Sequence, residues 1–193
     1  ISRGLVGSEM CIRDSCPNCP LQKNCRAFAL GKQEQIPKKA APPKITQVVE
    51  VSVAVRLDGQ FLLRQNPEGQ RWAGLWDFIR FPLEDESLVP ESGFAAGNPL
   101  PRRFLNHVEK TVGEQTGLEV RIERFLAEQK HAVTRYQIRL QCLFASVQSL
   151  GEFSESKSQR WVSPAEFDSY PLSTTGRKLA RLLQKDGKQL RLL

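Results

Sequence analysis

The sequence predicts an α+β domain, and three patterns along the chain indicate it. Residues 48–55 place their valines on one face, as a strand does. Residues 102–116 carry apolar side chains at the spacing of a helix, and residues 136–147 alternate between apolar and mostly polar positions. We therefore expect one core, in which helices flank a β-sheet, preceded by a small Cys-rich metal loop and an extended linker.

The 193-residue chain is long enough for one domain of ordinary size and a small appendage. Its 28 Lys and Arg residues exceed its 21 Asp and Glu residues, and the net charge of +7 favours a polyanionic partner such as nucleic acid. No apolar run approaches the roughly 20 residues that cross a bilayer, and no secretory signal opens the chain. We expect a monomeric, cytoplasmic bacterial protein, associated with the nucleoid and not with a membrane.

Residues 1–15 show neither an apolar period nor a capping signal. They resemble the translated adapter sequence seen at the ends of open reading frames from environmental assemblies. We interpret them as a non-native scar left by a cut just before Cys16, with a disordered native start as the alternative.

Three cysteines, Cys16, Cys19 and Cys25, follow in the pattern C-x2-C-x5-C within residues 16–31. Four of the five cysteines crowd between Cys11 and Cys25, which favours a metal over a disulfide framework. Three thiolates suit Zn²⁺ with a fourth ligand or three corners of a 4Fe–4S cluster, and the spacing leaves both open.

A helical turn is expected at residues 26–30, ended by Gly31. Residues 32–47 then form a basic, Pro-rich linker, whose composition favours an extended and solvated backbone. This linker separates the cysteine loop from the domain at residues 48–193.

The domain begins with the strand at 48–55, and an Asp-Gly pair at 58–59 predicts a hairpin turn into a strand at 61–64. Residues 72–82 predict a loop that leads to a strand, and residues 84–101 a loop. Trp72, Trp76 and Phe78 could stack on bases, but we expect them to pack in the core.

The first long helix is expected at 102–116, between Pro101 and Gly117. Strands are expected at 119–128 and 136–147, and the second of them places Cys142 on its apolar face as a buried thiol. The remaining expected elements are a strand at 160–162, a capping box at 163–166 and a helix at 173–184.

The segment CPNCPLQKNCRAF is similar to the iron–sulfur loop of the endonuclease III and adenine DNA glycosylase group, whose pattern is C-x6-C-x2-C-x5-C. Cys16, Cys19 and Cys25 match in register, but Glu9 occupies the first cysteine position and Cys11 lies two residues out of place. The resemblance implies a 4Fe–4S cluster in the parent family and an incomplete or absent one here, with zinc as the alternative.

The segment VSVAVRLDGQFLLRQNPEGQRWAGLWDF resembles the start of the Nudix-like C-terminal domain of the MutY-type adenine glycosylases. Its residues 73–78 resemble the family motif AGLWEFP, and the two similar segments together cover nearly all of residues 16–185. The resemblance implies a mixed β-sheet flanked by helices. It also implies that the catalytic Asp and Glu lie in an upstream helical domain that is missing here.

A true Nudix hydrolase is the rival interpretation. Pyrophosphate hydrolysis needs several carboxylates on one helical face to hold Mg²⁺, and that family supplies them in the box R-E-U-x-E-E-x-G-U. Residues 110–118 correspond to the box but keep one carboxylate of three, because Thr111 and Gln115 occupy the other two positions. We therefore interpret this helix as scaffold.

Residues 131–136 form the turn expected between two strands, and they are similar to an H-x-F-S-H loop with which adenine glycosylases recognise 8-oxoguanine. His131 matches the first His of that loop, Val133 the Phe, Thr134 the Ser and Arg135 the second His. Thr134 keeps a hydroxyl and Arg135 can contact a phosphate or base, whereas Val133 removes an aromatic wedge. The alternative is an ordinary hairpin turn with polar residues.

Five basic residues are candidate phosphate contacts: Lys38, Lys39, Lys44, Arg64 and Arg71. Taken together, the resemblance implies the C-terminal part of an adenine DNA glycosylase of base excision repair, binding duplex DNA with 8-oxoguanine opposite adenine and inactive alone. The alternatives are a degenerate Nudix nucleotide pyrophosphohydrolase and a zinc-stapled interaction module with no role on DNA.

Overall fold

The computed structural model describes residues 16–35, 44–70, 72–95, 97–154 and 156–189. The chain divides into two compact units, Ile1–Lys44 and Ile45–Leu193, which are considered separately. In the part of the chain that the structure describes, none of the helices has the length and apolar character needed to cross a membrane.

In residues 16–35 of the first unit, the elements are short helices. They are the 3₁₀ helices η1 (Cys16–Asn18), η2 (Gln22–Asn24) and η3 (Gln33–Gln35) and the single turn α2 (Arg26–Ala29). Gly31 ends α2 with a positive φ of 64°, and its N–H donates to the carbonyl of Phe28 at 3.0 Å. The helical turn predicted before Gly31 is therefore confirmed.

Seven strands of the second unit form one mixed sheet with the strand order β3-β2-β1-β6-β5; β4 pairs with β1, and β7 pairs with β2. The strands are β1 (Thr46–Leu57), β2 (Gln60–Gln65), β3 (Trp76–Asp77), β4 (Ile79–Pro82), β5 (Glu119–Val133), β6 (Tyr136–Ser149) and β7 (Gln159–Val162). The pairing of β1 with β6 is parallel, whereas the other named pairs are antiparallel. The predicted mixed sheet is confirmed.

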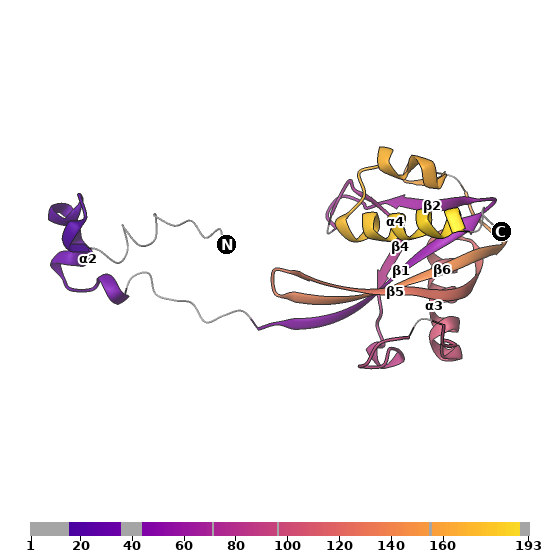
Figure 1. Ribbon diagram of the computed structural model, residues 1–193, viewed down its shortest axis with the longest axis horizontal. Coiled ribbons are helices and arrows are strands. Elements are labelled where there is room, and N and C mark those ends of the chain that lie inside the picture. Colours follow the sequence, from indigo (N-terminus) through magenta and orange to yellow (C-terminus); the bar gives the residue numbers. More distant parts are fainter. Residues whose placement is uncertain (1–15, 36–43, 71, 96, 155, 190–193) are drawn as a thin grey trace. The chain divides into compact units, whose positions relative to one another are not determined.

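Each face of the sheet packs on one long helix (Figure 1). Helix α3 (Arg102–Thr116) buries Phe104, Val108 and Val112 against the valines of β1, while α4 (Thr174–Gln189) buries Leu179 and Leu183 against β6. Because both faces are covered, β1 is buried from Val49 to Val55 without interruption. The one-sided strand expected at 48–55 is in fact a central strand.

Local sequence patterns predicted most element boundaries correctly. Asp58 and Gly59, with φ values of 48° and 82°, form the predicted turn between β1 and β2. Helix α3 has the predicted bounds and ends at Gly117, whose φ is 77°. Its buried face contains Phe104, however, and Leu105 is only half-buried.

The last part of the chain follows the prediction closely. The N–H of Ser163 donates to the Glu166 carboxylate at 3.1 Å, and the Ser163 hydroxyl donates to the same carboxylate at 2.8 Å. This capping box opens the 3₁₀ helix η5 (Pro164–Ser169). Another short 3₁₀ helix, η4 (Glu86–Leu88), lies in the segment expected to be loop.

Cys142 on β6 is fully buried, as predicted, and burial raises the pKa of its thiol to about 12. The side-chain amide of Gln129 lies 3.4 Å from the sulfur. A thiol in this environment is a core residue and not a nucleophile.

Candidate functional site

A long hairpin made of β5 and β6 projects beyond the helices that cover the sheet (Figure 1). β5 was expected to end at Glu128, but it continues to Val133, and Gln129 to Val133 pair in register with Leu140 to Tyr136 of β6. This pairing satisfies the backbone groups of residues that carry little apolar pattern of their own. His131 and Val133 are therefore strand residues, and the prediction that placed them in the turn is wrong.

The turn itself consists of Thr134 and Arg135, both exposed. Thr134 has a φ of 51°, and its hydroxyl donates to the carbonyl of Val133 at 2.7 Å. The guanidinium of Arg135 donates to the hydroxyl of Tyr136 at 3.0 Å and lies 5.2 Å from the centre of its ring. Because the N–H of Thr46 donates to the carbonyl of Arg135 at 2.9 Å, β1 also anchors this tip.

His131 faces the body of the domain and is half-buried. Its Nε2 lies 3.4 Å from Nη2 of Arg80, and its ring centre lies 6.2 Å from that of Trp72. A guanidinium can only donate, so this contact is a hydrogen bond in the tautomer that carries its proton on Nδ1. The imidazole of His131 therefore helps to hold the hairpin against the rest of the domain and is not part of the turn.

Arg80 on β4 is the centre of this support, and its side chain is 9 % exposed. Its Nε and Nη2 donate to the Glu50 carboxylate at 2.6 and 2.5 Å, and its Nη1 donates to the Thr175 hydroxyl at 2.9 Å. Nη1 also lies 3.6 Å from the carboxylate of Asp77. We call Arg80, Glu50, Asp77, Thr175, Trp72 and His131 the Arg80 cluster.

The carboxylates of the cluster are held where water hardly reaches them. Asp77 is 2 % exposed, and burial raises its pKa although the Ser173 hydroxyl, Arg80 and the N–H of Phe78 act in the opposite direction. The Ser173 hydroxyl donates to Asp77 at 2.6 Å. Sequence analysis did not identify Glu50 or Arg80. Each is a charged residue inside an apolar strand, and that pattern is the signal that could have revealed them.

Trp72 corrects one prediction about the aromatic residues. Trp76 and Phe78 are core residues, as expected, but Trp72 is half-buried with a φ of 60° and lies outside the core clusters. The guanidinium of Arg80 lies over its indole, 4.5 Å from the ring centre. A bulky residue with positive φ persists only where its surroundings hold it there.

A second group of charges lies on the hairpin beside a cavity of about 700 Å³, which is lined in part by Lys130, Gln137 and Arg139 and also by His131. Arg139 donates to the Glu128 carboxylate at 2.9 Å, and Gln141 donates to it at 2.7 Å. Burial by itself would raise the pKa of Glu128, but the hydrogen bonds from Gln141 and Arg139 outweigh it and lower that pKa. Lys130 is mostly exposed and lies 3.4 Å from the same carboxylate.

The predicted phosphate contacts are spread over different surroundings. Lys44 is exposed, whereas Arg64 is half-buried in a separate cavity; Lys38, Lys39 and Arg71 lie outside the described residues.

The predicted metal loop does not assemble a metal site among the residues described. Cys16, Cys19 and Cys25 are half-buried, and the N–H of Cys19 donates to the carbonyl of Cys16 at 3.2 Å. In residues 16–35, and in the rest of the chain that the structure describes, no three His, Cys, Asp or Glu side chains are grouped so as to hold a metal ion. Cys11 lies outside the described residues. No chemistry is assigned to a cluster here, and the metal stays a prediction.

The segment that corresponds to the Nudix box provides no metal-binding face either. Glu114 is exposed and lies 3.6 Å from Nζ of Lys110, while the Thr111 hydroxyl donates to the carbonyl of His107 at 2.9 Å. Gln115 accepts a hydrogen bond from Arg64. The interpretation of α3 as scaffold agrees with these contacts.

The profile of the NUDIX domain family matches residues 51–182. The adenine DNA glycosylase of Buchnera aphidicola subsp. Acyrthosiphon pisum (strain APS) is 29% identical over 86 residues, which are 44% of this chain and 25% of that protein. The chain thus spans about a quarter of the length of this curated relative.

Two solved structures share the fold. The MutT protein from Methanosarcina mazei Go1 has a TM-score of 0.56 at 18% identity, covering 76% of this chain and 99% of that one. The C-terminal domain of mouse MUTYH, solved in complex with human PCNA, has a TM-score of 0.52 at 18% identity, covering 74% of this chain and 91% of that one. At these identities the likeness establishes the fold alone.

Proposed function

The chain belongs to the NUDIX domain family, and from that premise we propose that it is the C-terminal, lesion-recognising part of an adenine DNA glycosylase of base excision repair. Its ligand in this proposal is duplex DNA that contains 8-oxoguanine opposite adenine. The observation that carries the proposal is the hairpin tip, where Thr134 and Arg135 are exposed at the end of a rigidly supported β-ribbon.

The hydrogen bond of the Thr134 hydroxyl supports discrimination between the two forms of guanine. Its proton is donated to the carbonyl of Val133, so its oxygen is left to accept. Guanine presents an acceptor at N7, whereas 8-oxoguanine presents an N7–H donor at that edge. An accepting Thr134 oxygen therefore pairs with the oxidised base and opposes the normal one.

Arg135 supplies positive charge at the same tip. Its guanidinium is exposed beside Tyr136 and has donors to spare for a phosphate or a base edge. The net charge of +7 adds a general attraction to the DNA backbone. Val133 is half-buried on β5 and provides no aromatic wedge, so recognition relies on hydrogen bonding.

The Arg80 cluster supports the proposal by holding the hairpin at its base. It joins β5 through His131 to β4, β1 and α4, so the tip is carried on a β-ribbon and not on a free loop. A recognition group works best when its supports leave it few alternative positions.

Adenine excision is part of this proposal only because the similar Buchnera protein is named an adenine DNA glycosylase. In this proposal the described residues supply recognition, and the hydrolysis of the glycosidic bond belongs to the part of the glycosylase that this chain does not span, since the chain covers 25% of its relative. A 4Fe–4S cluster or zinc ion on Cys16, Cys19 and Cys25 remains part of the proposal only as a family expectation.

A titration of the 193-residue chain with labelled duplexes tests the proposal. One duplex carries 8-oxoguanine opposite adenine, and its matched control carries guanine opposite adenine. We expect binding that weakens steeply with salt and is about tenfold tighter for the lesion, since one specific contact contributes roughly 1–3 kcal/mol. Equal affinity for both duplexes, or binding insensitive to salt, contradicts the proposal and favours an interaction module with no role on DNA.

A further inference from the structure

Helix α4 presents two faces of opposite character. Leu179 and Leu183 are buried against the sheet. Lys178, Arg181 and Lys185 are exposed, and their spacing of three and four residues places them in one line on the other side of the helix. We call these three residues the α4 ridge. At about 1.5 Å per residue, the ridge is roughly 10 Å long.

Among the described residues, no carboxylate pairs with the α4 ridge. Residues 174–185 contain four Lys or Arg side chains and no Asp or Glu. None of the salt bridges formed within the described ranges includes a ridge residue. The neighbouring Arg177, by contrast, lies 3.3 Å from the carboxylate of Asp168. The ridge is therefore a line of uncompensated positive charge.

The stability of the helix does not explain this arrangement. Lys178 and Arg181 are three residues apart, and Arg181 and Lys185 are four apart, so like charges repel one another along one face. The first turn of α4 has no acidic residue, although the helix dipole favours negative charge there. The ridge thus lowers the stability of the helix, and a polyanion lying along it would offset that cost.

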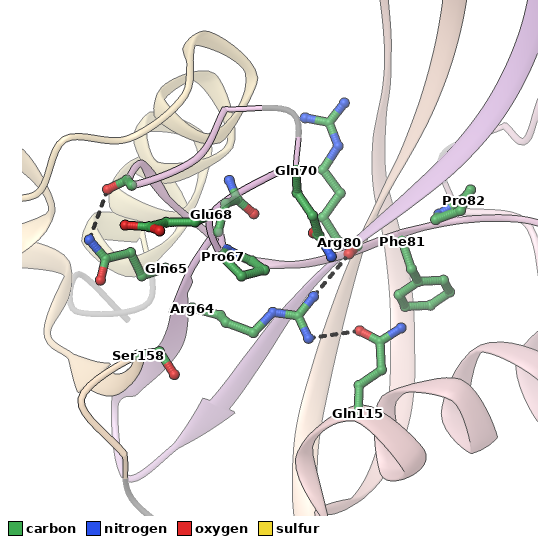
Figure 2. A pocket seen from close by; sticks show the side chains of 12 residues that line it. Arg64, Gln65, Pro67, Glu68, Gln70, Arg80, Phe81, Pro82, Gln115 and Ser158 are labelled. Carbon is green, nitrogen blue, oxygen red and sulfur yellow. Dashed lines mark hydrogen bonds between the residues drawn. The ribbon is translucent and has the colours of Figure 1, made fainter.

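Other arginines of the domain are held by protein groups. The guanidinium of Arg64 donates to the Gln115 side-chain oxygen at 2.9 Å and to the carbonyl of Arg80 at 3.2 Å (Figure 2). Arg139 donates to the Glu128 carboxylate at 2.9 Å. The ridge residues are exposed, so their charges remain available to a partner.

The α4 ridge lies on the same face of the sheet as the base of the hairpin. The hydroxyl of Thr175 accepts from Arg80 at 2.9 Å, and the carbonyl of Thr175 accepts from the Gln129 amide at 3.3 Å. Helix α4 therefore starts beside β5, and the hairpin projects past the start of α4 (Figure 1). An extended ligand that lies on the hairpin tip and continues over this face of the domain meets the ridge.

We propose that the α4 ridge binds the phosphate backbone of the duplex whose lesion the hairpin tip reads. This inference rests on the proposed function for the identity of that duplex. One DNA strand carries a phosphate about every 3.4 Å along the helix axis, so a ridge of roughly 10 Å can meet about three of them. Phosphate contacts carry no sequence information, so the ridge adds affinity equally for damaged and undamaged DNA and leaves discrimination to the tip.

Duplex titrations of the 193-residue chain over a series of salt concentrations test the proposal. The ridge variant carries Lys178→Gln, Arg181→Gln and Lys185→Gln. We expect it to bind the 8-oxoguanine:adenine and guanine:adenine duplexes at least tenfold more weakly, with the ratio of the two affinities unchanged. The slope of log affinity against log salt should become shallower by about 2.7, since each phosphate contact contributes roughly 0.9.

The matched control removes three exposed charges from α3, which covers the opposite face of the sheet: Arg102→Gln, Arg103→Gln and Lys110→Gln. Its net charge equals that of the ridge variant, and it should keep the salt slope of the wild type. Circular dichroism checks that each variant is folded. If the ridge variant does not fold, Arg181→Gln alone keeps the test valid, and the slope should then become shallower by about 0.9.

Equal losses of affinity in the ridge and α3 variants, or a salt slope that the ridge variant leaves unchanged, overturn the proposal. A ridge variant that keeps both duplexes but loses binding to phosphatidylserine vesicles also overturns it, and makes the ridge a membrane-surface site. A wild type that binds both duplexes equally, with a salt slope that depends on the ridge, contradicts lesion recognition and supports the ridge. The failures of the two proposals are therefore distinguishable, and a wild type that binds neither duplex overturns both.

Discussion

The guanidinium of Arg80 lies over the indole of Trp72, 4.5 Å from the ring centre, and the same side chain is paired with the buried Glu50 carboxylate. One residue therefore joins the loop before β3 to the central strand. His131 and Thr175 contact the same guanidinium, which extends the connection to β5 and α4. The β5–β6 hairpin is thus tied to β4, β1 and α4 through one buried cation, in addition to its backbone pairing with β1.

Arg80→Gln should destabilise the fold by about 3–5 kcal/mol, because Glu50 and Asp77 would remain buried without their cation. Urea unfolding followed by circular dichroism measures the loss. Lys110→Ala is the matched control, since its pair with Glu114 is 77 % and 63 % exposed and contributes under about 1 kcal/mol. Equal losses in the two variants would contradict the role given to Arg80.

Gly117→Ala should cost far more than Gly97→Ala. Both glycines have positive φ, 77° and 85°, so each substitution stores roughly 1–3 kcal/mol of backbone strain. A Cβ at Gly117 would also lie 2.8 Å from the backbone carbon of Glu152, whereas a Cβ at Gly97 meets nothing within 4 Å. The difference between the two unfolding free energies isolates the clash, and its absence would show that α3 and the segment at 152–153 are not packed as described.

Glu128→Gln should remove part of the acid sensitivity of the fold. The pKa of Glu128 is lowered from its ordinary 4.5, so its charged form stabilises the folded state above that pH. This contribution is lost as the pH falls through the folded-state pKa. The difference in stability between wild type and variant should therefore shrink between about pH 6 and pH 3; a constant difference over that range would count against the assigned hydrogen bonds.

The chain should release no phosphate from nucleoside triphosphates in the presence of Mg²⁺. Glu114 is exposed and lies near Lys110, and the neighbouring box positions hold Thr111 and Gln115, so no described group of carboxylates can hold the metal. A colorimetric phosphate assay with added inorganic pyrophosphatase, which converts any released pyrophosphate to phosphate, measures this against a blank without protein. Release that requires Mg²⁺ would favour the pyrophosphohydrolase alternative.

The sequence predicted well those elements whose signals are local. The Asp58-Gly59 turn, helix α3 with its stop at Gly117, and the capping box at Ser163 each depend on a few neighbouring residues. These signals act within one turn of the chain, so no knowledge of the partner elements was needed.

The failures involve contacts between distant residues. β5 extends to Val133 because its end pairs with β6, although Gln129, Lys130 and His131 carry no strand pattern. Trp72 lies outside the core and stacks against the guanidinium of Arg80 on β4. The spacing of residues in the sequence gives no sign of this contact. The family resemblance identified the hairpin tip, but it did not identify the Arg80 cluster that supports the hairpin.

The most direct test compares the affinity of the chain for the 8-oxoguanine:adenine duplex with that for the guanine:adenine duplex, in the wild type and in a variant with Thr134→Ala and Arg135→Ala. Arg103→Ala, an exposed charge at the start of α3, is the control for a general loss of charge. We expect the ratio of the two affinities to fall to about one in the double variant and to stay unchanged in the control. An unchanged ratio in the double variant would contradict recognition of the lesion by the hairpin tip.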